Sequence, residues 1–257
     1  MMAHQATVIL AAGMGKRMNS KIPKVLHSIL GTPLIHFSVR LSQKIGANPT
    51  VVVVGHKGNM VKECLKHYDI SFTCQKQQLG TGHAVMTAKK ILSDYKGPLL
   101  ILSGDVPLLK YDTLRALVKT HQKEACAITA LTTEMENPEA YGRIKRGSGN
   151  TVEAIVEDID ASEKEKLIKE INTGIYCIES PLIFELLEKV DCNNAKQEYY
   201  LTDVVSVARK MDLHVCAHKV SSSNEVCGIN TRTELANATE ILRTEIIKGL
   251  MEQGVTF

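Results

Sequence analysis

The sequence predicts an α/β fold in which helices flank a mostly parallel β-sheet. Strand-like and helix-like segments alternate through residues 7–131, and such alternation implies crossover connections between parallel strands. The strand-like segments at residues 50–54 and 99–102 are almost wholly apolar, as expected of strands buried on both faces. The first strand-like segment stops at a loop that contains Gly13 and Gly15. We therefore expect functional loops at the ends of the strands.

The first half of the chain divides into closely spaced strands and helices. The expected strands cover residues 7–11, 50–54, 70–74, 99–102 and 126–131, and the expected helices cover about 32–46, 57–68, 82–92 and 113–121. Thr32 and Pro33 are typical of the N-cap and first position of a helix, so the first helix should begin there. In the third helix, Ala84, Val85 and Ala88 lie close to one face, which indicates an amphipathic helix.

The alternation breaks after residue 133. A hairpin around residues 147–150 and a charged stretch at 157–170 are expected, followed by strands at 171–178 and 213–220 and by helices at 181–190, 201–211 and 231–251. The chain shows no repeat, linker or low-complexity segment. We therefore expect one compact unit over residues 1–257, with a first half at about 1–133, a second half at about 134–230 and a terminal helix at 231–257.

The composition excludes several classes of protein. The 257 residues are 44% hydrophobic without a long apolar run, and the N-terminus lacks the features of a signal peptide, so we expect a cytoplasmic protein that does not bind membranes. The seven cysteines are odd in number and include no Cys-x-x-Cys, which favours reduced thiols. We interpret all seven as packing residues rather than zinc ligands. A net charge of +3 without a basic tract gives no support for nucleic-acid binding.

The N-terminal segment is predicted to bind an anion. Its first 62 residues contain eight Lys or Arg and no Asp or Glu. Gly13 and Gly15 allow a ligand to approach the backbone, and exposed amides beside cations form phosphate sites. The nearby cations are Lys16, Arg17, Lys21 and Lys24. An ordinary turn with solvated lysines is the alternative.

Two familiar phosphate loops do not fit this segment. A dinucleotide-binding fingerprint needs a third glycine where Met18 stands, and an acid about 20 residues further on. A Walker loop needs glycine at Leu10 and a hydroxyl at Arg17. The chain therefore carries a different kind of phosphate loop.

Polar residues also follow two further strands. Gln75 and the run at 78–84 follow the third strand, and Asp105 follows the fourth. Ligands of open α/β sheets bind beyond the carboxyl ends of the strands, so these residues should meet the phosphate loop there. Asp105 is then placed to hold Mg²⁺, although it could also cap a helix.

These motifs resemble those of the sugar nucleotidyltransferases. Residues 10–18 and 23–24 match the opening motif Leu-x-x-Gly-x-Gly-x-Arg-Met followed by Pro-Lys. Within the family the chain is similar to the uridyltransferase domain of the bacterial bifunctional N-acetylglucosamine-1-phosphate uridyltransferases/glucosamine-1-phosphate acetyltransferases. The matching runs lie at residues 23–27, 78–84, 104–107, 141–144, 155–157, 170–175, 198–203 and 228–230.

The resemblance implies a Rossmann-like sheet of the nucleotide-diphospho-sugar transferase type with a smaller, β-rich sugar-binding elaboration. It implies that UTP and N-acetylglucosamine 1-phosphate react to give UDP-N-acetylglucosamine and pyrophosphate, with Mg²⁺ as cofactor. This product is a precursor of cell-wall peptidoglycan and lipopolysaccharide. The nucleophile is already an anion, so no general base is required, and His27 and His83 are interpreted as structural.

The resemblance also implies a role for individual residues. Arg17 and Lys24 are the catalytic cations. The triphosphate is bound by the backbone of Leu10, Ala11, Ala12, Gly13 and Gly15. Uracil is recognised by Gln75 and Gly80, with Thr81 nearby. Mg²⁺ is held by Asp105 and Asn230, and the sugar contacts Gly142, Glu157, Asn172 and Thr202.

Other interpretations of these residues remain open. Without the resemblance, Asn172 would be a buried cap, Glu157 a surface acid and Asn230 part of a strand-end turn. Ser103 stands where the family often has tyrosine, which leaves tolerance for other sugars open. The alternative functions are transfer to another sugar 1-phosphate and a non-catalytic, nucleotide-sugar-binding regulatory subunit.

In the bifunctional family a β-helix of hexapeptide repeats carries the acetyltransferase, and no hexapeptide periodicity occurs in this chain. We expect no reaction with acetyl-CoA and glucosamine 1-phosphate. We also expect a monomer or weak dimer, whether the chain is a truncated or a stand-alone uridyltransferase.

Overall fold

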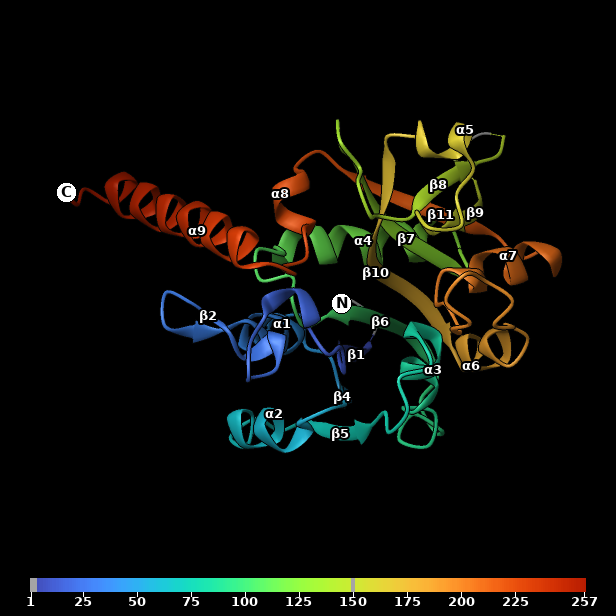
Figure 1. The fold of residues 1–257 in the computed structure, drawn as a ribbon, viewed down its shortest axis with the longest axis horizontal. Coiled ribbons are helices and arrows are strands. Elements are labelled where there is room, and N and C mark those ends of the chain that lie inside the picture. The colour runs from blue at the N-terminus through green and yellow to red at the C-terminus, as the bar shows by residue number, and fades with distance from the viewer. Residues whose placement is uncertain (1–3, 149–150) are drawn as a thin grey trace.

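The computed structural model describes residues 4–148 and 151–257, which form one twisted sheet with helices on both faces (Figure 1). The main path of the sheet runs β11-β7-β10-β6-β1-β4-β5. Its strands are β1 (Ala6–Ala11), β4 (Thr50–Val54), β5 (Ser71–Cys74), β6 (Gly97–Ser103), β7 (Ile128–Glu134), β10 (Glu170–Ser180) and β11 (Val215–Val220). All pairings on this path are parallel except those of β10, which is antiparallel to both neighbours. The prediction of a mostly parallel sheet flanked by helices is confirmed.

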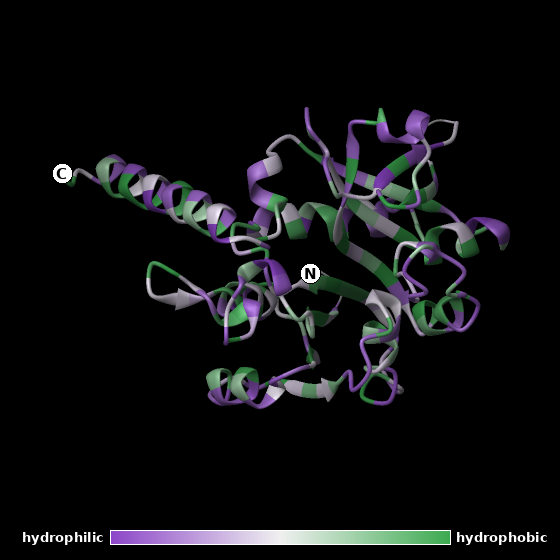
Figure 2. Ribbon diagram, viewed as in Figure 1, coloured by the Kyte–Doolittle hydropathy of each residue, from purple (hydrophilic) through white to green (hydrophobic). Residues whose placement is uncertain are grey.

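The strands in the middle of the sheet are buried on both faces because alternate residues enter two different cores. In β4, Val51 and Val53 join one core, whereas Val52 and Val54 join the other. The first core is covered by α3 (Thr81–Met86), α6 (Leu182–Leu187) and α7 (Asp203–Lys210), and the second by α1 (Leu34–Lys44), α2 (Gly58–Cys64) and α4 (Tyr111–Lys123). Figure 2 shows the resulting hydrophobic centre of the sheet.

The second half of the chain adds a hairpin and returns to the same sheet. β8 (Arg143–Arg146) and β9 (Val152–Val156) are antiparallel, and β8 pairs with β10 at Ile171. The predicted hairpin therefore forms, although its residues 149–150 lie outside the described part of the chain. The remaining elements are the 3₁₀ turns η1 (Lys16–Met18) and η2 (Lys24–Leu26), the two-residue strands β2 (Ser28–Ile29) and β3 (Thr32–Pro33), and the helices α5 (Glu163–Lys166), α8 (Ser223–Val226) and α9 (Arg232–Glu252).

The terminal helix α9 projects from the body of the molecule (Figure 1). It begins with a capping box in which the Thr231 side chain accepts from the backbone of Glu234 and the Glu234 carboxylate accepts from that of Thr231. Only its first half contacts the core, where Ala238 is buried beside Ile29 and Leu34. None of the described helices is both long and apolar enough to cross a membrane.

The first helix begins later than predicted. Thr32 pairs with Ile29 in the β2–β3 hairpin, so it is not an N-cap. Pro33 takes the cap position in an extended conformation, and the Leu34 amide donates to the carbonyl of His27 at 2.9 Å. That backbone bond replaces the side-chain cap.

Four other predicted helices are shorter in the structure. α2, α6 and α7 lose residues at their ends, and α3 stops at Met86 where the sequence predicts a helix to residue 92. The Thr73 hydroxyl donates to the carbonyl of Thr87 at 2.9 Å, and the Thr87 hydroxyl donates to the carbonyl of Ala84 at 2.7 Å. These side-chain bonds occupy carbonyls that a continuing helix would use.

The prediction of seven reduced cysteines is wrong for two of them. Cys126 and Cys216 form a disulfide across 90 residues of sequence, and Cys64, Cys74, Cys177, Cys192 and Cys227 are free. The pair could not be read from spacing because it joins the beginnings of two neighbouring strands, β7 and β11.

Candidate active site

The loop after β1 is shaped by a glycine. Gly15 has a φ of +61°, and a Cβ atom there would lie 2.6 Å from the Cβ of Lys24. Only glycine therefore lets the loop pack directly against Lys24. The loop also receives the Gln78 side chain, whose amide donates to the carbonyl of Ala12 at 2.8 Å.

A cavity of about 290 Å³ opens beyond the carboxyl ends of β1, β5 and β6. It is lined by Leu10, Ala11, Ala12, Gly13, Lys24, Val25, Gln75, Gln78, Gly80, Thr81, Ala84, Ser103, Asp105 and Glu198. We call it the nucleotide-side cavity, after the ligand that the sequence resemblance predicts for its residues. Nine of the residues singled out in the sequence line it, in accordance with the rule that parallel strands present their functional loops at one edge.

Gln75 is held in one orientation at the base of this cavity. Its side chain is buried, and its amide nitrogen lies 2.9 Å from the carbonyl of Gly80 and 3.1 Å from Nδ1 of His83. Gly80 has a φ of +107°, and a Cβ there would lie 2.5 Å from the carbonyl oxygen of Tyr199. Gly80 therefore allows its loop to pack closely against Tyr199. The packed loop in turn fixes the Gly80 carbonyl and the Gln75 amide that donates to it.

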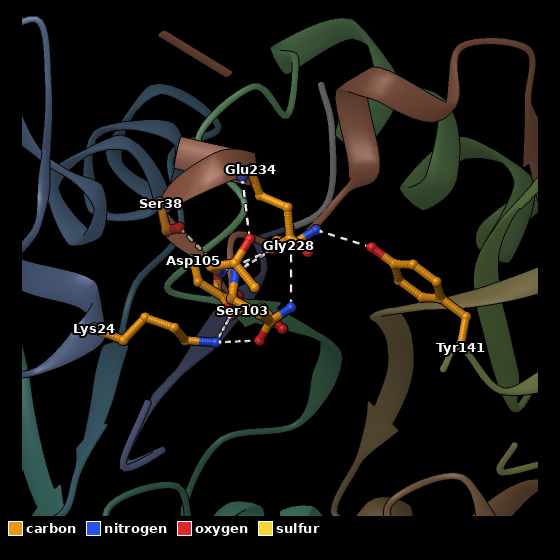
Figure 3. A network of polar contacts seen from close by, with 9 residues as sticks. Lys24, Ser38, Ser103, Asp105, Tyr141, Gly228 and Glu234 are labelled. Atoms are coloured by element: carbon orange, nitrogen blue, oxygen red, sulfur yellow. Dashed lines mark hydrogen bonds and ion pairs between the residues drawn. The ribbon is translucent and has the colours of Figure 1, made fainter. Parts of the chain in front are cut away.

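Lys24 and Asp105 meet at the centre of the site (Figure 3), and Asn230 is the third member of this cluster. The Lys24 ammonium donates to a carboxylate oxygen of Asp105 and to Oδ1 of Asn230, the latter at 2.8 Å. The side chains of Lys24 and Asp105 are only 12% and 17% exposed, so this ion pair is largely shielded from water. The cluster brings together residues 81 and 206 positions apart.

Asp105 and Asn230, whose side-chain oxygens accept from Lys24, are held in place by neighbouring groups of the chain. The Ile229 amide donates to the carbonyl of Asp105 at 2.9 Å. The Glu234 carboxylate accepts from the amides of Asn230 and Thr231. The start of α9 therefore anchors Asn230 beside Asp105.

A second cavity of about 320 Å³ lies beside the first, between β10 and the β8–β9 hairpin. It is lined by Leu10, Thr81, Ser103, Ala140, Tyr141, Gly142, Glu157, Asn172, Thr173, Gly174, Tyr176, Leu201, Thr202 and Asn230. We call it the sugar-side cavity, again after the ligand that the sequence resemblance predicts. Leu10, Thr81 and Ser103 line both cavities, so the two adjoin.

Several polar side chains line the sugar-side cavity, and Asn172 and Thr202 are among those that are buried. Oδ1 of Asn172 accepts from the Tyr176 hydroxyl at 2.9 Å and from the Gly174 amide at 3.2 Å, which directs its amide nitrogen away from these partners. The Thr202 hydroxyl donates to Glu157 at 3.1 Å. Burial raises the pKa of Glu157, and it also raises the pKa of the Tyr176 hydroxyl.

Two of the predicted site residues lie outside both cavities. Gly15 lines a third hollow on the outer side of the phosphate loop, together with Lys16 and Lys57. Arg17 is exposed on η1 and lines none of these three cavities. Its catalytic role stays a prediction.

Comparison with known proteins places the chain in a family. The family described as nucleotidyl transferase matches residues 6–222. The chain belongs to the nucleotidyl transferase family. The predicted resemblance is confirmed by curated relatives named Bifunctional protein GlmU. The relative from Syntrophotalea carbinolica is 48% identical, and the match covers 98% of this chain and 54% of the relative. The relative from Caldanaerobacter subterraneus subsp. tengcongensis is 44% identical, and the match covers 99% of this chain and 55% of the relative. The chain thus spans about half the length of these relatives.

A solved structure of UDP-glucose pyrophosphorylase complexed with UDP-glucose has the same fold. It matches this nucleotidyl transferase with a TM-score of 0.76 over 94% of this chain and 99% of that chain. The sequences are 19% identical, so the likeness bears on the fold alone.

The site of this nucleotidyl transferase contains residues that the sequence did not single out as binding residues. Gln78 lay within a recognised motif but was given no role, although it braces the phosphate loop. Tyr141 lies at the inner wall of the sugar-side cavity, where its hydroxyl is 3.3 Å from the Gly228 amide. Tyr176 is fully buried in a strand, and nothing in its local sequence separates it from a core residue.

The residues around Lys24 fit a magnesium ion. A carboxylate oxygen of Asp105 and the amide oxygen of Asn230 already converge on one cation, the Lys24 ammonium. Mg²⁺ is usually bound by one or two carboxylates together with substrate phosphates, and this donor set is of that kind.

Proposed function

We propose that this chain transfers the uridylyl group of UTP to N-acetyl-α-D-glucosamine 1-phosphate, giving UDP-N-acetylglucosamine and pyrophosphate. A phosphate oxygen of the sugar phosphate forms a bond to the α-phosphorus of UTP. The bond between this phosphorus and the oxygen bridging to the β-phosphate breaks, and pyrophosphate leaves with that electron pair. The nucleophile is an anion, so charge neutralisation and in-line positioning are the main requirements.

The chain's own groups meet these requirements. The loop from Ala11 to Gly15 offers backbone amides to the triphosphate, and Lys24 and Arg17 neutralise its charge. Neither histidine near the site needs to act as a base. His83 is bonded to Gln75, and burial lowers the pKa of His27, which favours a neutral structural ring.

Substrate recognition divides between the two cavities. Gln75 and the backbone of Gly80 read the edge of uracil, with Thr81 beside it. Gly142, Glu157, Asn172 and Thr202 contact the N-acetylglucosamine unit. A carboxylate and an amide held by neighbouring hydroxyls suit the hydroxyl and acetamido groups of such a sugar.

Asp105 and Asn230 are the residues that would hold Mg²⁺. When bound, this ion would neutralise charge on the phosphates and orient them.

One observation carries the proposal. The hydrogen bond from Lys24 to Asn230 joins a residue of the nucleotide-side cavity to a residue of the sugar-side cavity. The cluster of Lys24, Asp105 and Asn230 therefore stands where two substrates in adjoining cavities would meet. A site of this form suits the transfer of a group between two phosphorylated ligands.

Two alternatives remain open to test. Transfer to another sugar 1-phosphate would use the same cluster, and Ser103 is the lining residue that differs from the tyrosine common in the family. A non-catalytic regulatory subunit is disfavoured because Lys24, Asp105 and Asn230 are all present and in contact.

The test is pyrophosphate release with UTP, CTP or dTTP, each combined with four sugar 1-phosphates. We expect the highest kcat/KM with UTP and N-acetylglucosamine 1-phosphate, and loss of activity on chelation of Mg²⁺. Preference for another sugar phosphate would support the first alternative. Ligand binding without turnover of any pair would support the second.

A further inference from the structure

Four metal-ligating side chains meet at the opposite edge of the sheet from the candidate active site. Glu124 and Cys126 precede β7, and His214 and Cys216 stand at the beginning of β11. β7 and β11 are parallel, with Ile128 paired to Val215. Each of the two segments presents a pair of ligands spaced by one residue. His214 and Cys216 lie two apart at the start of a strand, where such side chains point the same way. Glu124 and Cys126 flank Ala125, which has a φ of +48° in the turn after α4, and this turn brings their donor atoms together.

The four donor atoms are already close together. One atom each from Glu124, Cys126, His214 and Cys216 lie within 4.8 Å of one another. Nε2 of His214 is 3.1 Å from Sγ of Cys216, and the Ala127 amide donates to the carbonyl of His214 at 2.8 Å. The backbone thus holds the two segments together independently of their side chains.

The chemistry of this group matches zinc. Zn²⁺ in structural sites takes four ligands in a tetrahedron, from thiolates, imidazoles and carboxylates. Bond lengths of about 2.3 Å to sulfur and 2.0 Å to nitrogen place two sulfurs about 3.8 Å apart and a sulfur and a nitrogen about 3.5 Å apart. The 3.1 Å contact between His214 and Cys216 needs only a small adjustment.

Burial also suits a metal site. Cys126 and Cys216 are buried, whereas Glu124 and His214 are exposed. The sulfurs are thereby shielded from water and the two surface ligands leave a path for an ion to enter. In the structure, however, the two sulfurs are joined as a disulfide, so they can act as ligands only after reduction.

We propose that reduction of the Cys126–Cys216 disulfide creates a Zn²⁺ site formed by these two cysteines, His214 and Glu124. A dithiol reductant supplies the two electrons: its sulfurs become a disulfide, and Cys126 and Cys216 become thiols. Both thiols release their protons when Zn²⁺ binds as the thiolate complex. The disulfide and the metal ion are then two alternative cross-links between β7 and the edge strand β11.

The site is independent of the proposed uridylyl transfer. It lies at the amino ends of the parallel strands, whereas the candidate active site lies at their carboxyl ends. Four protein ligands leave no open position for a substrate, so the metal would be structural. We expect it to change stability and to leave turnover unchanged.

A second cysteine–histidine pair provides a matched control. Nε2 of His36 lies 3.1 Å from Sγ of Cys64, the same distance as in the proposed site. The other ring nitrogen of His36 contacts the Tyr68 hydroxyl at 2.8 Å, and among the described residues no second cysteine joins Cys64 in a group of metal ligands. Cys64→Ser should therefore not affect metal binding.

The experiment titrates the whole chain with Co²⁺ or Zn²⁺ after reduction by a phosphine and removal of metal. Under denaturing conditions seven thiols should react after reduction and five before it. We expect one Co²⁺ per chain, with thiolate charge-transfer and tetrahedral d–d absorption that Zn²⁺ abolishes. At a free Zn²⁺ concentration about a hundred times its Kd, the Tm of the reduced protein should rise by roughly 5 to 10 °C.

Variants separate this site from adventitious binding. Cys126→Ser and Cys216→Ser should weaken metal binding by roughly 100-fold or more, since even outer partners of metal ligands cost 10- to 100-fold. His214→Asn and Glu124→Gln change exposed side chains, so they test the site if the cysteine variants fail to fold. The proposal is overturned if the disulfide resists reduction in the folded chain. It is also overturned if the reduced chain and the His214→Asn variant bind Co²⁺ equally.

Discussion

The two adjoining cavities use different means to bind a ligand. The nucleotide-side cavity is lined mainly by residues at or after the ends of β1, β5 and β6, and its charged side chains are Lys24, Asp105 and Glu198. The sugar-side cavity contains several buried or half-buried polar side chains, among which Glu157 and Asn172 are each held by a hydroxyl. Phosphates need amides and charge, which a glycine loop supplies, whereas a sugar needs hydrogen-bonding groups in fixed positions. This contrast predicts that substitutions in the nucleotide-side cavity lower kcat, whereas substitutions in the sugar-side cavity raise the KM for the sugar phosphate.

The largest effect is expected at Asp105, which lines the nucleotide-side cavity and contacts Lys24. Asp105→Asn removes the carboxylate that faces Lys24 and, by our proposal, Mg²⁺. We expect kcat to fall about 1,000-fold, the upper end of the loss of one preorganised electrostatic group, with little change in the KM of either substrate. Steady-state kinetics and the circular dichroism spectrum check this. Asp112→Asn, an exposed acid in the first turn of α4, is the control; a near-normal kcat for Asp105→Asn would show that the metal site lies elsewhere.

The next effect concerns the cations of the nucleotide side. Lys24→Ala and Arg17→Ala should each cost about 3 kcal/mol of transition-state stabilisation, or roughly 100-fold in kcat. Lys16→Ala is the matched control on the same loop and should lose far less. Arg17 is exposed and lies outside both cavities. An unchanged kcat for Arg17→Ala would therefore show that, of these two cations, Lys24 alone stabilises the transition state. Equal losses for all three variants would indicate a diffuse positive field.

On the sugar side, the expected defect is one of affinity. Glu157→Gln removes a charge that can accept hydrogen bonds from sugar hydroxyls, and such bonds contribute about 1.5 to 3 kcal/mol. We expect the KM for the sugar phosphate to rise roughly 10- to 100-fold and the KM for UTP to stay unchanged. Glu153→Gln, an exposed acid on β9, should behave like the wild type. A rise in the KM for UTP instead would contradict the division of roles between the cavities.

The smallest effect is on stability and follows from the acids behind the sugar-side cavity. Burial, and then the charge of Glu157, raises the pKa of Asp203 from 3.8 to about 6. Between these values the folded state binds more protons than the unfolded state, so this group makes stability fall as the pH rises from about 4 to 6. Asp203→Asn should remove that fall.

We expect Asp203→Asn to gain about 1 kcal/mol at pH 7.5, a value discounted for partial exposure, or roughly 2 to 4 °C in Tm. At pH 4 the variant and the wild type should melt together. Thermal denaturation at the two pH values measures the difference. A wild type that is more stable than the variant at pH 7.5 would show that Asp203 stabilises the fold as an anion.

The sequence alone predicted the strands better than the helices. β4 and β6 were evident because a strand buried on both faces must be apolar at nearly every position. The ends of helices depend on single hydrogen bonds that come from elsewhere, as the Thr73 hydroxyl shows for α3. Local patterns do not contain that information.

The sequence also determined which residues stand at the carboxyl edge of the sheet. Gln75 and Asp105 were placed there because parallel strands deliver their following loops to one side. This is a consequence of chain direction and needs no knowledge of the strand order. The resemblance then supplied the residues of the second half, such as Glu157 and Asn172, whose local sequence is compatible with ordinary surface or capping roles.

Only the tertiary structure decided which distant residues touch. Lys24 meets Asn230 because the start of α9 returns to the edge of the sheet beside Asp105, 206 residues after Lys24. Cys126 meets Cys216 because β11 pairs with β7. β11 lies at one end of the sheet beside β7, and β10 lies between β7 and β6. Such contacts follow from strand order, which depends on packing the whole chain around two cores, and no spacing within a short segment encodes it.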